Sequence, residues 1–355
     1  MHDTKSSQNP GLAKSNQNAG LRSAQKAKKD EFYTRLADIE NELRHYRAHF
    51  KGKTVFCNCD DPRVSNFFYY FSYGFAHLGL NKLITTCYKN RARDLFSMND
   101  GETAISLAYL GEKNGNRVPD PEQIGIRQLV GDGDFRSDEA IKLLQESDIV
   151  VTNPPFSLFR EYIGQLIEYE KNFLIIGNIN AVTYKEVFPL IRDNKVWLGP
   201  SIRSGDRAFG VPNDYPLEAA GCGIDEDGNK FIKVKGVRWF TNMDFPARHQ
   251  ELVLHRKYNP DDYPMYHNYD AINVDKTRDI PVDYDGAMGV PITFLDRYNP
   301  NQFEILGSSG TLARRMSELA PKGTYRGNAG RFYLDNGNGT YRRLYDRVVI
   351  RKRQP

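Results

Sequence analysis

The feature that most constrains the fold is a regular alternation of short apolar runs and amphipathic segments between residues 54 and 241. Short apolar runs rich in β-branched side chains are typical of strands that are buried on both faces. The segments between them carry apolar residues three and four positions apart, which is the spacing of one helix face. The alternation therefore predicts an α/β fold with a doubly wound, mainly parallel, Rossmann-like sheet covered by helices on both faces.

The expected strands are residues 54–59, 82–87, 128–130, 148–152, 173–177, 196–198 and 237–241. The expected helices are residues 32–50, 62–78, 137–144, 158–169 and 184–191, and residues 90–125 form a polar, glycine-containing excursion. Beyond about residue 245 the alternation stops, and the expected strands there are residues 292–295 and 347–353. In a doubly wound sheet, ligands bind at the carboxyl ends of the strands. We therefore expect the loops at residues 60–61, 131–135 and 153–156 to form one site.

The loop Asn153-Pro154-Pro155-Phe156 directly follows the expected strand at residues 148–152. A buried strand that ends in two prolines and an aromatic residue gives a rigid, concave edge at which a planar amine can be held. The side-chain oxygen of Asn153 and the carbonyl of Pro154 can accept both N–H bonds of such an amine, and Phe156 can stack on its ring. These residues predict methyl transfer to the exocyclic nitrogen of a base. The alternative is a proline-stiffened strand end with Phe156 in the core.

Two other loops carry acidic residues that suit a methyl donor. Asp60 and Asp61 follow the first strand and can bind an ammonium group, although Asp61, which precedes a proline, also fits the start of a helix. In the loop Gly-Asp-Gly-Asp-Phe, Asp134 can accept a hydrogen bond from an adenine amino group while Phe135 packs against the ring. Asp132 is the second candidate for that role, and the alternative for the whole loop is an ordinary tight turn.

Composition excludes several classes of protein. No apolar stretch approaches the roughly 20 residues of a membrane span, and the N-terminus lacks the apolar core of a signal peptide. The four cysteines form no Cys-x-x-Cys pair and no disulfide-dense pattern, so a cytoplasmic protein with reduced thiols is expected. His45 and His49 lie four residues apart, but no third ligand is evident, and no metal site is predicted.

Charge is distributed unevenly along the chain. Residues 1–29 carry six Lys or Arg and one acidic residue, and residues 311–355 carry eleven Lys or Arg and three acidic residues. Because the whole chain has a net charge of only +4, its middle is acidic. Residues 1–29 are also rich in Ser, Asn, Gln and Gly, and are expected to be disordered. The two basic ends predict contacts with nucleic-acid phosphates and binding that weakens steeply with salt.

Several strings, in order along residues 30–306, are similar to those of the adenine-specific DNA methyltransferases of the EcoRI type. They are Asp-Glu-Phe-Tyr-Thr at residues 30–34, Cys-Asn-Cys-Asp-Asp-Pro-Arg-Val-Ser-Asn-Phe-Phe at 57–68, Gly-Asp-Gly-Asp-Phe-Arg-Ser at 131–137, the segment 148–160, and Met-Gly-Val-Pro-Ile-Thr-Phe-Leu at 288–295. The resemblance implies that Phe32 and Tyr33 pack on the cofactor. It also implies S-adenosyl-L-methionine as cofactor and methyl donor, and N6 of a flipped-out adenine in double-stranded DNA as acceptor.

The resemblance also implies a domain organisation. After the basic tail at residues 1–29, it predicts a methyltransferase domain at 30–250 and a C-terminal target-recognition, DNA-binding region at 251–355. We expect a monomer from a restriction–modification or phage system. The chain departs from the wider superfamily in two places: its first loop has no glycine-rich turn, and Cys87-Tyr88 stand where an acidic residue usually holds the ribose. The alternatives are a methyltransferase acting on RNA or on a protein glutamine, an N4-cytosine acceptor, and a catalytically dead DNA-binding regulator.

Overall fold

The computed structural model describes residues 33–88, 104–111, 119–211, 217, 221–327 and 330–354. The predicted disordered tail, Phe32 and much of the polar excursion lie outside these residues. Among the described residues, no helix is both long enough and apolar enough to cross a membrane.

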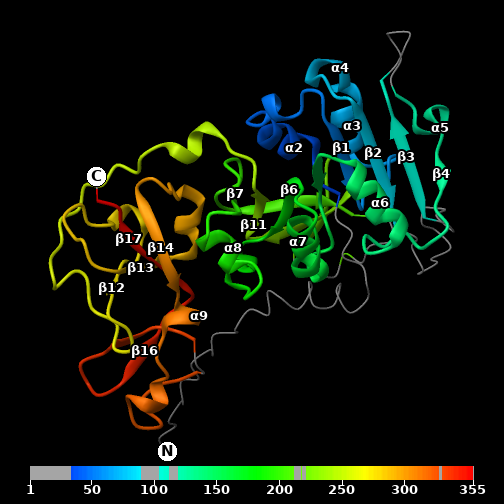
Figure 1. Ribbon diagram of the computed structural model, residues 1–355. Helices are drawn as coiled ribbons and strands as arrows, with labels where there is room; N and C mark the ends of the chain where they lie inside the picture. Colours follow the sequence, from blue (N-terminus) through cyan, green and yellow to red (C-terminus); the bar gives the residue numbers. More distant parts are fainter. Residues whose placement is uncertain are drawn as a thin grey trace, which may run out of the picture.

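An eight-stranded sheet, the central sheet, has the strand order β4-β3-β2-β1-β5-β6-β11-β7 (Figure 1). Its strands are β1 (Thr54–Asn58), β2 (Lys82–Cys87), β3 (Ile105–Tyr109), β4 (Arg127–Gln128), β5 (Ile149–Thr152), β6 (Asn172–Asn178), β7 (Trp197–Leu198) and β11 (Val237–Thr241). The four strands in the middle, β2, β1, β5 and β6, are parallel, and β3 and β11 on either side run antiparallel to them. The edge strands β4 and β7 pair antiparallel with β3 and β11, so they run in the same direction as the middle four. The prediction of a mainly parallel sheet is therefore confirmed.

Helices cover both faces of the central sheet. On one face, α2 (Leu36–Leu43) and α3 (Asn66–Tyr73) share an apolar cluster with Val55 of β1. On the other face, α6 (Asp138–Glu146), α7 (Phe159–Glu168) and α8 (Phe188–Arg192) share a cluster with Phe56. Successive residues of a strand face opposite sides, so the fully buried β1 contributes to both cores. The shorter helices of this part are α4 (Phe75–Leu78), α5 (Pro121–Ile124) and the 3-10 helices η1 (Arg47–His49), η2 (Phe156–Leu158) and η3 (Ile179–Thr183).

Two predicted strands are wrong because other segments take their places in the sheets. The strand predicted at residues 128–130 shrinks to the two-residue edge strand β4, since β3 occupies the place beside β2, and Val130 is 97% exposed. The strand predicted at residues 292–295 is the 3-10 helix η6 (Ile292–Arg297). The residues just before it, β13 (Met288–Pro291), pair with the final strand of the chain instead.

The predicted helices exist, but several are shorter than their apolar patterns indicate. The helix predicted at residues 62–78 begins only after its cap, Ser65, and is interrupted at Gly74 between α3 and α4. The helix predicted at residues 32–50 is α2 followed by η1. Ser137 caps α6 as predicted, by accepting a hydrogen bond from the third residue of the helix at 3.2 Å.

The C-terminal part is built on a four-stranded sheet with the order β12-β13-β17-β14. Its strands are β12 (Ile272–Asn273), β13, β14 (Phe303–Ser308) and β17 (Arg347–Lys352), and β17 confirms the predicted final strand. Sequence patterns did not predict two smaller sheets: β8 (Asp206–Gly210) with β10 (Lys230–Lys235) and β9 (Cys222–Ile224), and the hairpin of β15 (Tyr333–Asp335) and β16 (Tyr341–Arg343). The remaining short helices are α9 (Ser309–Leu312), η4 (Pro246–His249), η5 (Thr277–Asp279) and η7 (Met316–Glu318).

The central sheet and the C-terminal part share one apolar core. Phe240 of β11 belongs to the same buried cluster as Phe294 of η6 and Val348 of β17. A buried ion pair crosses the same junction, with 2.6 Å between Arg238 Nε and Asp296 Oδ1. The C-terminal part therefore packs directly on the edge of the central sheet that β11 and β7 form.

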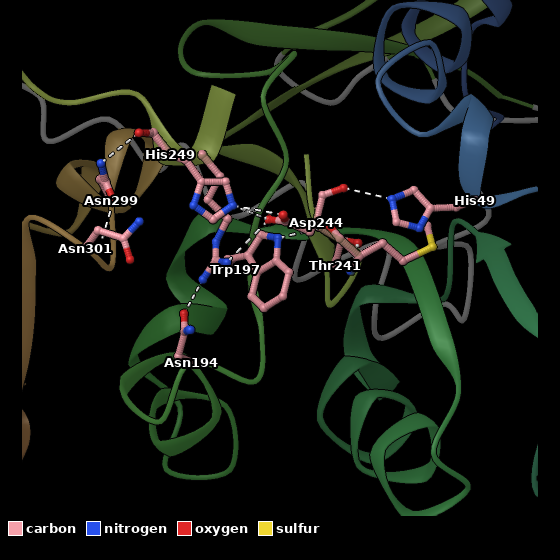
Figure 2. A network of polar contacts seen from close by, with 10 residues as sticks. His49, Asn194, Trp197, Thr241, Asp244, His249, Asn299 and Asn301 are labelled. Carbon is pink, nitrogen blue, oxygen red and sulfur yellow. Dashed lines mark hydrogen bonds and ion pairs between the residues drawn. The ribbon is translucent and has the colours of Figure 1, made fainter. Parts of the chain in front are cut away.

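A network of polar contacts reinforces this junction (Figure 2). The ring of His249 lies 2.8 Å from Asp244 Oδ1, and the carbonyl of His249 accepts a hydrogen bond from Asn299 Nδ2 at 3.1 Å. Arg248 stacks on Trp197, with its Cζ 3.6 Å from the ring centroid. The network lies where β11 ends, beside the beginning of β6, so it occupies the edge of the sheet opposite the carboxyl ends of the parallel strands.

Candidate active site at the carboxyl ends of the strands

The strand order places a switch point between β1 and β5. From β1 the chain crosses over to β2 on one side, while β5 pairs with β1 on the other side. Loops at the carboxyl ends of two such strands diverge and leave a crevice in which ligands bind. Here they are residues 59–61 after β1 and residues 153–156 after β5, and Asp60 in the first loop contacts Thr152, the residue just before the second.

The loop after β5 begins from a buried anchor. Thr152, the last residue of β5, has no exposed surface, and Pro154 is buried. Asn153 between them is half-buried. The backbone on both sides of the Asn153 amide is therefore fixed by packing.

The second half of this loop turns the chain into α7. The carbonyl of Pro155 accepts a hydrogen bond from Leu158 N at 3.0 Å, which closes the 3-10 turn η2. Phe156 is partly buried and packs against the apolar cluster on the α3 face of the sheet. Its ring is thus supported by the core without being fully enclosed, as a residue that stacks on a ligand requires.

Asp60 connects the two loops. Its Oδ2 lies 2.6 Å from Thr152 Oγ1, and its Oδ1 accepts a hydrogen bond from Ser65 Oγ at 2.9 Å. Thr152 Oγ1 also contacts the carbonyl oxygen of Asn58. Burial raises the pKa of Asp60 to about 7, although the two hydroxyl groups oppose the rise. Near neutral pH, Asp60 therefore exists both as a neutral acid and as a carboxylate.

The residues on either side of Asp60 shape the loop. Asp61 Oδ1 accepts a hydrogen bond from Arg63 N at 2.9 Å, and the Asp61 carbonyl accepts one from Ser65 N at 2.8 Å. These contacts fit its alternative interpretation, as the residue that opens the turn before α3. Cys59 has a φ of 73°, so a cysteine makes the left-handed turn for which glycine is usually used.

The loop at residues 131–135 reaches the end of β2. Gly133 has a φ of +77°, and a Cβ on it would lie 2.8 Å from the carbonyl oxygen of Cys87, so the position requires glycine. The N–H of Asp134 donates to Asp132 Oδ1 at 3.1 Å. Arg136 donates to both carboxyl oxygens of Asp134, at 2.8 and 2.6 Å. These hydrogen bonds hold the pKa of Asp134 below its usual value.

Two buried hydroxyl groups near these loops lack partners. Phe135 packs edge-on against Tyr162 of α7, with 5.1 Å between ring centroids. The Tyr162 hydroxyl is fully buried, is close enough to Asp60 to feel its charge, and has no hydrogen-bond partner among the described residues. Thr34 Oγ1 is also buried without a hydrogen-bond partner among the described residues, and the backbone carbonyl of Thr34 accepts a hydrogen bond from Asn66 Nδ2 at 2.8 Å.

Tyr33 is held beside this region by the three-stranded sheet. Its backbone pairs with Gly210 of β8 through two hydrogen bonds, of 2.8 and 2.9 Å. The segment that contains Tyr33 and Thr34 is therefore tied both to β8 and to the start of α3. Phe32, predicted to act with Tyr33, lies outside the described residues.

Sequence reasoning missed three residues of this site: Ser65, Thr152 and Tyr162. Ser65 carries a signal, because serine before an apolar run is typical of a helix cap. Thr152 carries a weaker one, as the polar end of an apolar strand, and Tyr162 cannot be told from the core residues on its helix face. Among the residues that the structure describes, no three His, Cys, Asp or Glu side chains are grouped so as to hold a metal ion.

Most of the chain is similar to a defined set of proteins. The family model described as Adenine-specific methyltransferase EcoRI matches residues 20–353. The chain is 53% identical over 297 residues to the type II methyltransferase M.EcoRI of Escherichia coli, a match that covers 83% of this chain and 90% of that protein. It is 38% identical over 335 residues to the type II methyltransferases M.MgeORF184P of Mycoplasma genitalium and M.MpnI of Mycoplasma pneumoniae, with 93% of this chain and 98% and 97% of those proteins covered. No solved structure gives a significant match.

Proposed function

We infer, from the premise that the chain belongs to the family of the adenine-specific methyltransferase EcoRI, that it methylates N6 of adenine in double-stranded DNA with S-adenosyl-L-methionine as donor. Membership of this family makes the protein an enzyme, an adenine-specific methyltransferase. A base inside a duplex cannot reach a loop at the edge of a sheet, so the target adenine must be flipped out of the stack. We assign the protein to a restriction–modification or phage system and expect it to act as a monomer.

The observation that carries this proposal is the position of residues 153–156 at the switch point of the sheet. N6 is a poor nucleophile because its lone pair is delocalised into the ring. Two acceptors aimed at its N–H bonds, the Asn153 side-chain oxygen and the Pro154 carbonyl, favour a pyramidal nitrogen with the lone pair directed outward. Phe156 stacks on the flipped base, which is worth roughly 1–3 kcal/mol.

The residues around the β1 loop suit S-adenosyl-L-methionine. The half-buried Asp60 carboxyl is a partner for its ammonium group, and the partnerless hydroxyls of Thr34 and Tyr162 are buried polar atoms that a polar ligand would satisfy. Asp134, with Asp132 as the second candidate, accepts from the adenine amino group, because a carboxylate that binds arginine still has acceptor capacity. When bound, the donor supplies an electrophilic methyl group on a sulfonium.

The chemistry then requires mainly positioning. The proton of N6 can leave after methyl transfer, so no strong general base is needed at the site. Asn153 and Pro154 orient the nitrogen, Phe156 fixes the plane of the base, and Asp60 fixes one end of the donor. Holding two reactants in line in this way lowers a barrier mainly through orientation and fixed electrostatics.

We assign DNA binding to the C-terminal part, and above all to residues 309–346, which we call the arginine lobe. Its exposed Arg314, Arg315, Arg326, Arg342 and Arg343 have no ion pair among the described residues. In Figure 1, α4, which leads into the amino end of β2, is at the top, and the lobe with α9 and β16 is at the bottom. In this view the lobe therefore lies on the side of the molecule toward which β2 runs, and we propose that a duplex bound to it reaches the crevice.

The test is methylome sequencing of a methylation-free host that expresses the wild type, Asn153→Ala or Asn301→Ala. Asn301 is an exposed asparagine at the junction of Figure 2 and serves as the matched control. We expect N6-methyladenine in one sequence motif with the wild type and with Asn301→Ala, and none with Asn153→Ala. Methylation that persists in Asn153→Ala would overturn the catalytic assignment. No modified base with any protein would favour an RNA or protein acceptor, or a protein that binds without catalysing.

A further inference from the structure

One buried hydroxyl group joins the proposed cofactor loop to the proposed catalytic loop. Thr152 has no exposed surface and directly precedes Asn153. Its Oγ1 contacts two acceptors of the β1 loop, the carbonyl oxygen of Asn58 and, at 2.6 Å, Asp60 Oδ2. A threonine hydroxyl carries one proton, so it can donate to only one of these oxygens at a time.

All of these contacts are hydrogen bonds only when Asp60 is protonated. The Asp60 carboxyl then donates to Thr152 Oγ1, while the Thr152 hydroxyl donates to the carbonyl of Asn58. With Asp60 as a carboxylate, Thr152 must turn its proton toward Oδ2, and the Asn58 carbonyl loses that donor. Ser65 fits both states, because its hydroxyl donates to Asp60 Oδ1 and its oxygen caps α3. The two states differ by one proton and by the direction of one hydroxyl.

The surroundings of Asp60 oppose its ionisation, whereas a bound cation favours it. Burial is the largest cause that raises the pKa of Asp60 to about 7, and the negative charge of Asp61 adds to it. Arg63 reaches Asp61 Oδ2, at 3.8 Å. An ammonium group beside Asp60 has the opposite effect and favours the carboxylate. The other titratable groups near Asp60 are Cys57 and Tyr162, whose pKa values the negative charge of Asp60 raises, and the thiol of the neighbouring Cys59 contacts Asn58 Oδ1.

We propose that Thr152 is a positioning residue that couples the binding of the donor at Asp60 to the alignment of Asn153. The inference rests on the proposed function, in which the donor's ammonium group binds at Asp60. On binding, Asp60 gives its proton to solvent and Thr152 turns its hydroxyl to the carboxylate. The residue before Asn153 is then held to the cofactor loop by a charge-assisted hydrogen bond, which is roughly twice as strong as a neutral one.

The test is the pH dependence of cofactor affinity, measured without DNA. The probe is S-adenosylhomocysteine, which carries the same ammonium group and cannot donate a methyl group, and its dissociation constant is measured by calorimetry from about pH 5.5 to 8.5. Because protons compete with the ligand for Asp60, the wild type should bind about tenfold more weakly for each pH unit below the pKa of Asp60. The break in this curve is the pH below which the affinity begins to fall, and it marks the pKa of Asp60. Thr152→Val removes a donor to the carboxylate and should move this break to higher pH, by about one unit. Thr152→Ser keeps the hydroxyl and should keep the wild-type break.

Thr241→Val is the matched control. Thr241 is also fully buried in the central sheet, but its hydroxyl bonds to backbone groups, Phe173 O at 2.6 Å and Met243 N at 3.0 Å. This variant should lose stability without moving the break. If Thr152→Val behaves like Thr241→Val, the role of Thr152 is structural and the inference is overturned.

Other outcomes separate the inference from the proposed function. A wild-type affinity that does not change with pH would overturn the inference and leave the cofactor assignment standing. Absence of binding at every pH would overturn both. If Thr152→Val does not fold, Asp60→Asn is the deciding variant, since it should abolish the break. A break at the wild-type pH in Asp60→Asn would show that the proton that competes with the ligand does not bind to Asp60, and would overturn the inference.

Discussion

Cys59 shows, at the scale of single residues, how the β1 loop turns without a glycine. Its φ of 73° lies in the left-handed region, where a Cβ costs about 1 kcal/mol. Cys59→Gly should therefore be more stable than Cys59→Ala by about 1 kcal/mol in urea unfolding. At Cys222, within strand β9, the same two substitutions should give the opposite order, because glycine weakens a strand. Equal stability of the two Cys59 variants would show that the loop relaxes out of this conformation.

Glu42 makes stability depend on pH. It is fully buried in α2, where Tyr46 donates to Oε1 at 3.0 Å and Ser201 N donates to Oε2 at 2.9 Å. Burial raises its pKa to about 7, well above the value of about 4.3 in an unfolded chain. A raised folded-state pKa stabilises the fold at pH values below the unfolded pKa, and this contribution is lost as the pH rises through about 7.

The free energy of unfolding of the wild type, relative to Glu42→Gln, should therefore fall between about pH 5 and pH 7, by at most about 1.4 kcal/mol per pH unit. Urea unfolding at several pH values measures it. Glu40→Gln is the matched control, because Glu40 is exposed on the same helix, and it should follow the wild-type curve. A constant difference between wild type and Glu42→Gln at all pH values would contradict the prediction.

The sequence predicts residue roles where the determinants are local. Asn153 is identified from the strand before it and the prolines after it, all within a few positions. The contact of Thr152 with Asp60 joins residues 92 positions apart, and only the pairing of β1 with β5 brings them together. The roles assigned to Asn153, Asp60 and Asp134 stay predictions, and the structure adds that Asp134 is already engaged by Arg136.

At the scale of elements, a buried ion pair fastens β11 to η6. Arg238 Nε lies 2.6 Å from Asp296 Oδ1 and Arg238 Nη2 lies 2.9 Å from Oδ2, and the two side chains are 4% and 5% exposed. Removing one partner leaves an uncompensated buried charge, so Arg238→Met should cost about 3–5 kcal/mol in urea unfolding. Replacing both, as in Arg238→Met with Asp296→Leu, should recover most of this loss.

The exposed pair of Arg192 and Asp193, 2.8 Å apart, supplies the control. Arg192→Met should leave stability unchanged within error, because solvent screens an exposed pair. A double variant at Arg238 and Asp296 that is as unstable as Arg238→Met alone would show that the cost comes from lost packing and not from the isolated charge.

Elements with a strong local pattern are predicted well, and those that depend on distant partners are not. The buried strands β1, β2, β5 and β6 form continuous apolar runs and are found where the sequence indicates. The edge strand β4 and the small sheet of β8, β9 and β10 are stabilised by neighbours that no local pattern reveals. At residues 292–295 the apolar run is real, but the strand position beside β17 belongs to the residues before it.

At the scale of the whole molecule, the proposed boundary at residue 250 separates two regions with different proposed roles, but these regions share one core. Phe240 on one side of it and Phe294 on the other lie in one buried cluster. The ion pair of Arg238 and Asp296 spans the same boundary. The C-terminal part, to which we assign DNA binding, is thus held at a fixed position relative to the crevice. A sequence-specific enzyme needs such a fixed position if the target base is to reach the proposed catalytic loop.

We expect the arginine lobe to determine how the affinity of the protein for DNA depends on salt. Each phosphate contact that releases a counterion contributes about −0.9 to the slope of log affinity against log salt concentration. Arg342→Ala with Arg343→Ala should therefore make the slope shallower by about 1–2 and weaken binding at low salt. Arg44→Ala with Arg192→Ala removes the same charge from exposed positions near the amino ends of the parallel strands, and should leave the slope unchanged. Because the two double variants have equal net charge, equal slopes would show that the duplex does not contact the lobe, and a shallower slope for the lobe variant alone would place its phosphates there.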